Sequence, residues 1–144
     1  MRISAVPFGA LDRLTAFSLW KLRQDVFVVE QVCAYPDLDS RDLAPETRHV
    51  ILEDEQGAVL GCARVLDDGD EWRIGRVALH RTLRGQGWAD RILEAAIAVC
   101  PDRDIVLDAQ SPLAGWYATF GFEVCGPEFM EDFIPHLPMV RRAG

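Results

Sequence analysis

One stretch of the chain, residues 76–89, restricts what this protein can fold into more than any other. Residues 72–79 are apolar and rich in β-branched side chains, a pattern that predicts a β-strand. From residue 89 to residue 100, apolar residues recur at spacings of three and four, which predicts an amphipathic helix. Two glycines, Gly85 and Gly87, lie between these segments. A strand, a glycine turn and a helix therefore follow one another directly.

A turn of this kind is a favourable place to bind an anion. The first backbone N–H groups of a helix have no partner inside the helix, and the helix dipole adds partial positive charge there. Glycine also lets another group approach the main chain closely. The pattern therefore predicts a phosphate-binding turn, although a strand–glycine–helix junction more often serves only as a packing turn.

Two well-known phosphate-binding motifs do not fit this turn. A P-loop ends in Gly-Lys-Ser/Thr, whereas Gly87 is followed by Trp88 and Ala89. A dinucleotide-binding turn needs a small residue where Asp90 stands, and an acidic residue at the end of a second strand. Asp108 lies near the required distance but falls inside its predicted strand.

The sequence around the turn resembles the acetyl-CoA motif of the GNAT N-acetyltransferases. The pattern is Arg84-x-x-Gly87-x-Ala89, preceded by a strand that ends in Val77-Ala-Leu79. Trp116-Tyr117-Ala-Thr-Phe-Gly121-Phe122 resembles a later helix of the same family. Three further segments are similar to the ElaA-like subgroup of that family: residues 22–31, 35–39 and 134–136. These segments cover most of the chain, in the family's order.

The periodicity and the resemblance agree on an α/β fold. We expect one domain, residues 1–144, with a GNAT-like mixed sheet of about six to seven strands flanked by helices. The family's motif strand and the next strand splay apart, so the same is expected here. Strands are predicted at residues 3–6, 49–53, 59–66, 72–79, 105–109, 122–124 and 139–141. Helices are predicted at residues 11–28, 89–100 and 113–120, the last with Ser111 as its N-cap, and an exposed loop at 33–47.

The charge of the chain narrows the classes of partner. The 144 residues include 15 Lys and Arg against 23 Asp and Glu, a formal net charge of −8. This argues against nucleic acid or an anionic membrane as a partner. It suits a cationic amine acceptor, although a role in solubility alone explains it equally well. The sequence does not fix the oligomeric state, and a homodimer is possible.

Cysteine usage and the N-terminal segment indicate the compartment. Cys33, Cys62, Cys100 and Cys125 show no C-x-x-C pairing and are expected to be mostly buried free thiols. No apolar run is long enough to span a membrane, and the first residues lack the apolar core of a signal peptide. We therefore expect a cytoplasmic protein.

The resemblance implies how the cosubstrate, acetyl-CoA, would bind. The main chain of the motif strand would receive the pantetheine arm, and the backbone amides of the turn would hold the pyrophosphate. The implied cofactor-binding residues are Val77, Ala78, Leu79, Arg84, Gly85, Gln86, Gly87, Trp88 and Ala89. The chain departs from the family's pattern at three positions that bear on the thiol, the cofactor groove and the phosphate: Gln110, Trp88 and Asp90.

The resemblance also implies direct attack of a primary amine on the thioester. Tyr117 occupies the position from which the family protonates the leaving thiolate, and a core tyrosine is its alternative role. Many GNAT enzymes carry an acid on the motif strand, but residues 72–76 contain none. Glu30 is the candidate for a general base or an amine anchor, with a solvated or paired carboxylate as the alternative.

Other polar residues are given less specific roles. Asp37, Asp39 and Asp42 are expected to line the entrance for a cationic substrate, or simply to solvate their loop. No metal is expected, because the three histidines lack closely spaced partners. No G-x-S-x-G elbow is present, which argues against a hydrolase.

Two functions follow from the sequence. The first is an acetyl-CoA-dependent N-acetyltransferase that modifies the amine of a small molecule, peptide or protein. The alternative is a non-catalytic acyl-CoA-binding or regulatory module. The missing strand acid slightly favours the module, whereas Tyr117 favours the enzyme.

Overall fold

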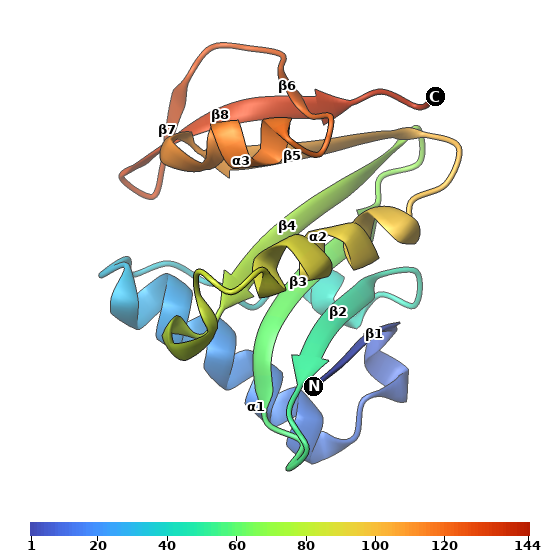
Figure 1. The fold of residues 1–144 in the computed structure, drawn as a ribbon, viewed down its shortest axis with the longest axis vertical. Helices are drawn as coiled ribbons and strands as arrows, with labels where there is room; N and C mark the ends of the chain where they lie inside the picture. The colour runs from blue at the N-terminus through green and yellow to red at the C-terminus, as the bar shows by residue number, and fades with distance from the viewer.

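The computed structural model describes all 144 residues, and its centre is one eight-stranded sheet (Figure 1). The strand order is β1-β2-β3-β4-β5-β8-β6, and β7 pairs with β8. All neighbouring strands are antiparallel except β4 and β5. The strands are β1 (Arg2–Val6), β2 (Arg48–Glu53), β3 (Val59–Asp67), β4 (Glu71–Leu79), β5 (Asp104–Gln110), β6 (Glu123–Val124), β7 (Phe129–Glu131) and β8 (Ile134–Arg141).

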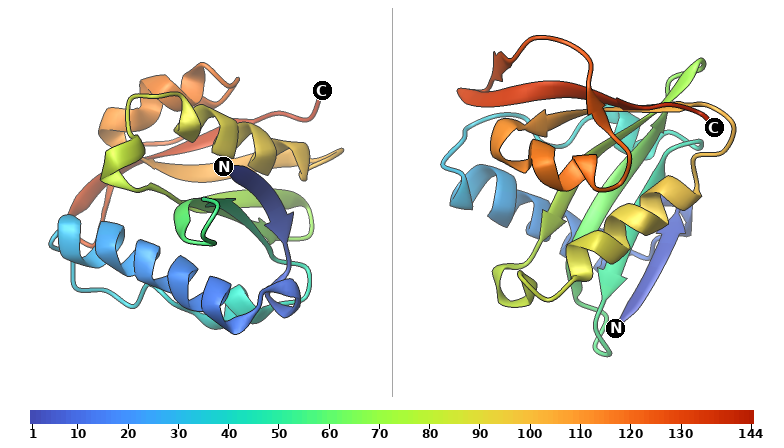
Figure 2. Two further views of the ribbon diagram at one scale, coloured as in Figure 1. Left: turned by 60° about the horizontal axis from the view of Figure 1, so that its bottom comes forward. Right: turned by 45° about the horizontal axis from the view of Figure 1, so that its top comes forward.

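Helices cover both faces of the sheet (Figure 2). On one face lies α1 (Arg13–Arg23), which Asp12 caps and which continues as the π-helix η2 (Gln24–Glu30). On the other lie α2 (Trp88–Ala98) and the short α3 (Ala114–Ala118). The 3₁₀ turns are η1 (Phe8–Ala10), η3 (Ser40–Leu43), η4 (Arg81–Leu83) and η5 (Ser111–Leu113). None of these helices has both the length and the apolar character needed to cross a membrane.

The alternation of side chains along the strands divides the core into two parts. The larger cluster packs Ile92, Leu93 and Ala96 of α2 against the sheet. The smaller cluster packs Leu19 and Leu22 of α1 on the opposite face. Since successive residues of a strand point to opposite faces, β2, β3 and β4 each contribute to both clusters. The face covered by α1 and η2 is called the α1 face below, and the opposite one the α2 face.

The strands β4 and β5 splay apart, as expected from the resemblance. They pair over only three positions, from Glu71–Asp104 to Arg73–Val106. Beyond Arg73 the two strands diverge, which is visible in Figure 1 as a wedge that opens away from the chain turn at residues 99–104. The remainder of β4 therefore has an edge without a strand partner.

A β-bulge in β4 aims one side chain out of the sheet. Between the pairs Cys62–Ala78 and Arg64–Gly75, β4 has one residue more than β3. Arg76 lies in this bulge with φ of 50°, in the left-handed region that costs energy for a residue with a Cβ atom. Its guanidinium contacts the loop after η2, which holds the bulge in this conformation.

The aspartates of that loop correct the sequence prediction. Asp37 and Asp42 are only 7% and 2% exposed, so they neither solvate the loop nor form the expected lining of an entrance. Arg23, itself 1% exposed, donates to both carboxylates at 2.9 and 2.7 Å. A charged side chain in a predicted loop looks solvated from sequence alone, because its buried partners are distant along the chain. Arg64 and Arg76 join the same ion-pair network, together with Asp39.

Two further predictions were wrong in detail. The sheet has eight strands, whereas six to seven were predicted, because the sequence analysis missed β7. In addition, β8 begins five residues before the predicted strand at 139. The two prolines of β8, Pro135 and Pro138, obscured the strand pattern. Ser111 does not cap α3; its hydroxyl donates to Glu128 at 2.8 Å. Three of the four cysteines are buried and all four are free thiols, as expected.

Candidate functional site

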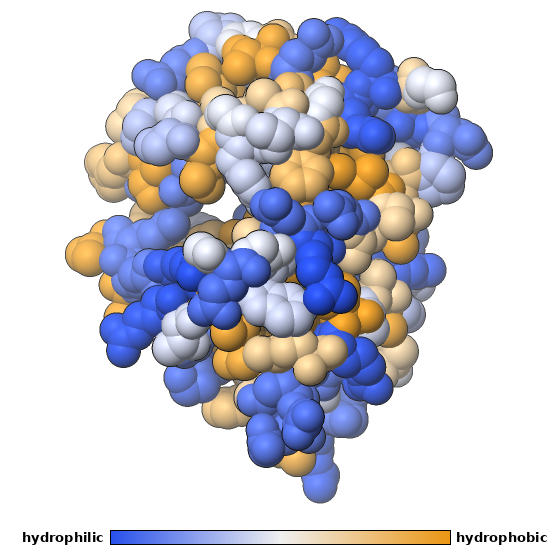
Figure 3. Space-filling view, in the orientation of Figure 1, coloured by the Kyte–Doolittle hydropathy of each residue, from blue (hydrophilic) through white to orange (hydrophobic).

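A cleft of about 530 Å³ lies in the wedge between β4 and β5. The surface in Figure 3 is hollowed at the left of the molecule, between the part built on β5 and β8 and the part below it. Residues from both faces of the sheet line the cleft, including Tyr117 from the α2 face and η2 from the α1 face. The splay therefore gives access to the edge of β4 from both sides.

The turn before α2 presents five consecutive backbone amides without a partner in the chain, those of residues 85–89. Gly85 and Gly87 both have positive φ, 75° and 87°, and Gly87 is the N-cap of α2. A Cβ atom at either glycine would meet nothing within 4 Å, so there is open space beside both glycines of the turn. An anion placed here would accept several N–H groups at the positive end of the helix dipole.

The edge of β4 that faces the gap belongs to Val77 and Leu79, and the carbonyl oxygen of Leu79 there accepts a hydrogen bond from Arg84. The N–H of His80 donates to the carbonyl oxygen of Leu60 in β3 at 2.7 Å. Because the backbone groups of successive strand residues point to opposite sides, the N–H and C=O of Leu79 point away from β3. The intervening Ala78 directs its backbone toward β3 and contributes only its methyl group to the cleft wall. Extended chains add to such an edge by main-chain hydrogen bonds.

The phenol of Tyr117 lies against this cleft from α3. The residue is 6% exposed and packs against Trp116 and Phe122 by edge-to-face contacts. Burial raises the pKa of Tyr117 to about 12, and its hydroxyl has no hydrogen-bond partner in the chain. A phenol held in this state stays protonated near neutral pH and can donate a proton.

Glu30 at the end of η2 is paired with the turn before α2. Arg84 donates to its two carboxylate oxygens at 2.6 and 2.9 Å, and to the carbonyl oxygen of Leu79 at 3.0 Å. The hydrogen bond from Arg84 lowers the pKa of Glu30. A carboxylate with a lowered pKa is a weaker base, so this geometry favours a role in positioning Arg84 over the predicted role as general base.

Replacing Glu30 by glutamine tests that role. The variant keeps the size of the side chain but removes the charge that holds Arg84. We expect the KM for acetyl-CoA to rise by up to about fivefold, the factor that matches about 1 kcal/mol for an exposed ion pair. The kcat should stay within about twofold of wild type, as measured with an amine acceptor in saturating acetyl-CoA. A large fall in kcat with an unchanged KM for acetyl-CoA would instead support the predicted role of Glu30 as the general base.

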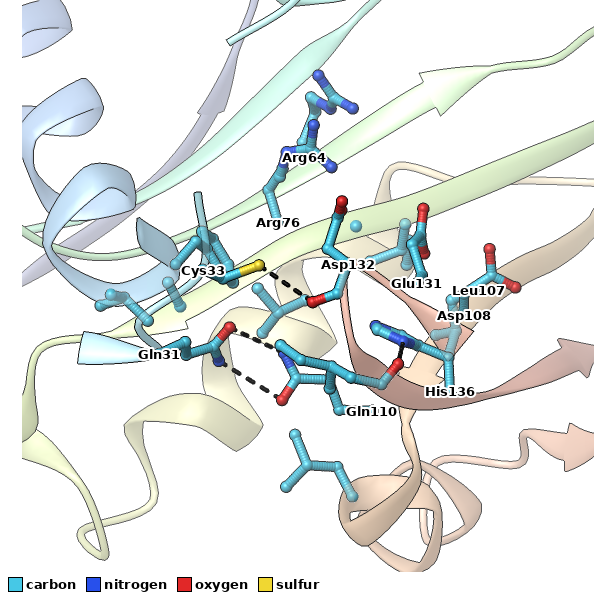
Figure 4. Close-up of a pocket in the computed structure, with 18 of the residues that line it drawn as sticks. Gln31, Cys33, Arg64, Arg76, Leu107, Asp108, Gln110, Glu131, Asp132 and His136 are labelled. Atoms are coloured by element: carbon cyan, nitrogen blue, oxygen red, sulfur yellow. Dashed lines mark hydrogen bonds between the residues drawn. The ribbon is translucent and has the colours of Figure 1, made fainter. Parts of the chain in front are cut away.

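On the α1 face the cleft is polar, and two contacts cross it (Figure 4). The side-chain amides of Gln31 and Gln110 exchange hydrogen bonds of 3.4 and 3.2 Å. The thiol of Cys33 donates to the carbonyl oxygen of Asp132 at 3.2 Å. The loop after η2 is thereby joined to β5 and to the turn between β7 and β8. Gln110 was noted in the sequence as the residue that stands for the family's amide side chain after this strand, but its partner Gln31 was not given a role.

Two departures from the family's pattern have local partners. The carboxylate of Asp90 accepts the indole N–H of Trp116 at 2.7 Å, which turns it toward α3. Trp88 packs under the guanidinium of Arg91, with 4.8 Å between the guanidinium carbon and the ring centroid. The side chains of Asp90 and Trp88 therefore both contact other residues beside the turn. No group of three or more His, Cys, Asp or Glu side chains is placed to hold a metal ion.

The sequence pattern of the acetyltransferase (GNAT) domain family matches residues 23–143. The chain belongs to the GNAT family. It is also 47% identical over 135 residues to a UPF0039 protein of Mycobacterium tuberculosis, a match that covers 91% of this chain and 86% of that protein. The splayed sheet and the glycine turn described above are thus those of a GNAT protein.

Two solved structures superpose on nearly the whole chain. The crystal structure of Escherichia coli ElaA has a TM-score of 0.88 and 32% identity, and the match covers 99% of this chain and all of that one. An acyl-CoA N-acyltransferase from Pseudomonas aeruginosa also gives a TM-score of 0.88, with 33% identity over 98% of this chain and 99% of that one. The GNAT fold and the ElaA-like resemblance predicted from the sequence are confirmed.

Proposed function

We propose that this GNAT protein transfers an acetyl group from acetyl-CoA to the primary amine of a cationic acceptor. The observation that carries the proposal is one cleft lined by the edge of β4, by Tyr117 and by Arg84, the residue that directly precedes the open amides of the turn. The relative from Pseudomonas aeruginosa, named as an acyl-CoA N-acyltransferase, supports the same chemistry. Membership of the GNAT family supports acyl transfer in general. That the transferred group is acetyl and that the acceptor is an amine is what we propose.

In this proposal each part has one task. The amides of residues 85–89 hold the pyrophosphate, and the edge at Val77 and Leu79 pairs with the pantetheine arm. A backbone N–H of the same strand polarises the thioester carbonyl, as in an oxyanion hole. The amine attacks from the α1 face, and Tyr117 gives its proton to the sulfur as the C–S bond breaks.

Binding of acetyl-CoA by the turn is tested with Gly87→Val. The isopropyl group would stand in the open space before the amides, and the backbone would be strained at φ of 87°. We expect the affinity for acetyl-CoA, measured by calorimetry, to fall by more than about tenfold, because the phosphates could no longer approach the amides.

The control is Gly57→Val in the turn between β2 and β3. Gly57 has φ of 82° and the same open surroundings, so its valine variant has comparable backbone strain far from the turn. Its acetyl-CoA affinity should match that of wild type. Unchanged affinity in a folded Gly87→Val variant would place the phosphates elsewhere.

A further inference from the structure

The acceptor amine must lose a proton before it can attack, and the part of β4 that lines the cleft, residues 73–79, carries no acid for this task. The structure offers His136 on β8, which lines the cleft. Its register partner across β5 is Gln110, so the two side chains lie on the same face of the sheet. Leu107 and Met139 of these strands belong to the α2-face core, and alternation therefore places His136 and Gln110 on the α1 face. That is the face from which the amine attacks in the proposed function.

A hydrogen bond fixes the tautomer of His136. Its Nδ1 lies 2.7 Å from the carbonyl oxygen of Ile134, drawn as a dashed line in Figure 4. Because a carbonyl oxygen can only accept, Nδ1 must carry a hydrogen. In the neutral ring the lone pair is then on Nε2. The ring also stacks on Phe129 with centroids 5.8 Å apart and an interplanar angle of 23°, which restricts its orientation.

The carboxylates that line the cleft are less suited to the task. Glu30 is held by two hydrogen bonds from Arg84, and Asp108 lies 3.4 Å from a guanidinium nitrogen of Arg73. Glu131 and Asp132 also line the cleft, but both residues are exposed at the hairpin between β7 and β8. The half-buried His136 alone combines a fixed ring with a nitrogen free to accept a proton.

We propose that His136 is the general base that deprotonates the acceptor amine, an inference that rests on the proposed acetyl transfer. Nε2 takes one proton from the ammonium group and becomes positively charged, and the neutral nitrogen attacks the thioester carbonyl. The C–S bond breaks, the thiolate takes the proton of Tyr117, and the phenolate recovers one from the new amide nitrogen. Nε2 then releases its proton to water. The products are the amide, CoA and one proton, so the step balances.

The test compares two amines of similar shape but different basicity, ethylamine and trifluoroethylamine. Ethylamine is almost fully protonated at neutral pH, whereas the fluorinated amine is almost fully neutral and needs no base to release its lone pair. In His136→Gln we expect kcat for ethylamine to fall by about a hundredfold or more, and kcat for trifluoroethylamine to fall by less than about tenfold. The KM for acetyl-CoA should change by less than about twofold.

Three results would overturn the proposal. The first is a wild-type kcat for ethylamine in His136→Gln; the second is an equal loss with both amines, which would mean positioning or packing. The third is that Glu131→Gln, and not His136→Gln, loses activity with ethylamine. If the glutamine variant does not fold, His136→Asn retains a donor for the carbonyl of Ile134 and gives the same comparison. Failure of the wild-type protein to acetylate these two amines and any other small amine, peptide or protein would instead refute the proposed function.

Discussion

Replacing Tyr117 by phenylalanine is expected to lower kcat by about a hundred- to ten-thousand-fold while leaving the affinity for acetyl-CoA almost unchanged. The sulfur of a bound thioester is a poor hydrogen-bond acceptor, so the phenol contributes little to binding. As the C–S bond breaks, the sulfur gains negative charge and the hydrogen bond strengthens. The variant keeps the ring and its contacts with Trp116 and Phe122, and it removes a hydroxyl that has no partner in the chain. Turnover and melting temperature are measured together.

Tyr35→Phe is the matched control, since Tyr35 is the other tyrosine of the chain and lines the same cleft. Its hydroxyl donates to the buried carboxylate of Asp37, and burial, with that contact, raises the pKa of Tyr35. We expect this variant to lose stability and to retain most of its kcat. If Tyr117→Phe turned over a reactive amine like wild type, the proton would have to come from water or another group.

Replacing Asp42 by alanine is expected to lower the free energy of unfolding by about 3–5 kcal/mol. Arg23 would remain buried with one of its two carboxylate partners gone, and Arg64 would lose its contact at 3.1 Å. Arg64 already has a buried Nε atom without a hydrogen-bond partner, so this network has no spare acceptor. The value is measured by denaturant unfolding at neutral pH.

The control for Asp42→Ala is Asp25→Ala, which removes an exposed pair with Lys21 at 2.6 Å. That change should cost less than about 1 kcal/mol, because exposed ion pairs contribute little. Equal effects of the two substitutions would show that burial of the network is not what stabilises the loop after η2.

Acid should reduce the difference between wild type and Asp42→Ala. Burial alone would raise the pKa of Asp42, but hydrogen bonds from Arg23 and from the backbone of Asp39 outweigh it, so the pKa lies below its ordinary value of 3.8. A carboxylate with a lowered folded-state pKa stabilises the fold above its unfolded-state pKa. This contribution is lost as the pH falls through the folded-state value. The two unfolding free energies should therefore converge in strong acid.

Local patterns predicted the central elements of this fold because their signals lie within short segments. The strand β4, the glycine turn and α2 were all read from periodicity and from Gly85 and Gly87. The divergence of β4 and β5 came from the family resemblance and not from the residues. The start of β8 was missed because Pro135 and Pro138 interrupt the strand pattern, yet both pair with neighbouring strands.

Contacts between distant segments could not be predicted in the same way. Glu30 and Arg84 are 54 residues apart, and only the fold shows that they form an ion pair. Asp42 appeared solvated in the sequence because its partners are distant along the chain: Arg23 belongs to α1 and Arg64 to β3. The sequence pattern Ile134-Pro-His136 indicated the subgroup, but the hydrogen bond that fixes the histidine ring is visible only in the folded chain.

The most direct measurement of the central claim is a thiol-release assay with acetyl-CoA and a panel of primary amines, with the product identified by mass spectrometry. The proposed function predicts stoichiometric CoA and N-acetylated amine with at least one cationic amine, and a rate lower by more than about tenfold with Gly87→Val at limiting acetyl-CoA. Tight binding of acetyl-CoA by the wild-type protein with no thiol release across small amines, peptides and proteins would contradict it. The chain would then be a non-catalytic acyl-CoA-binding module.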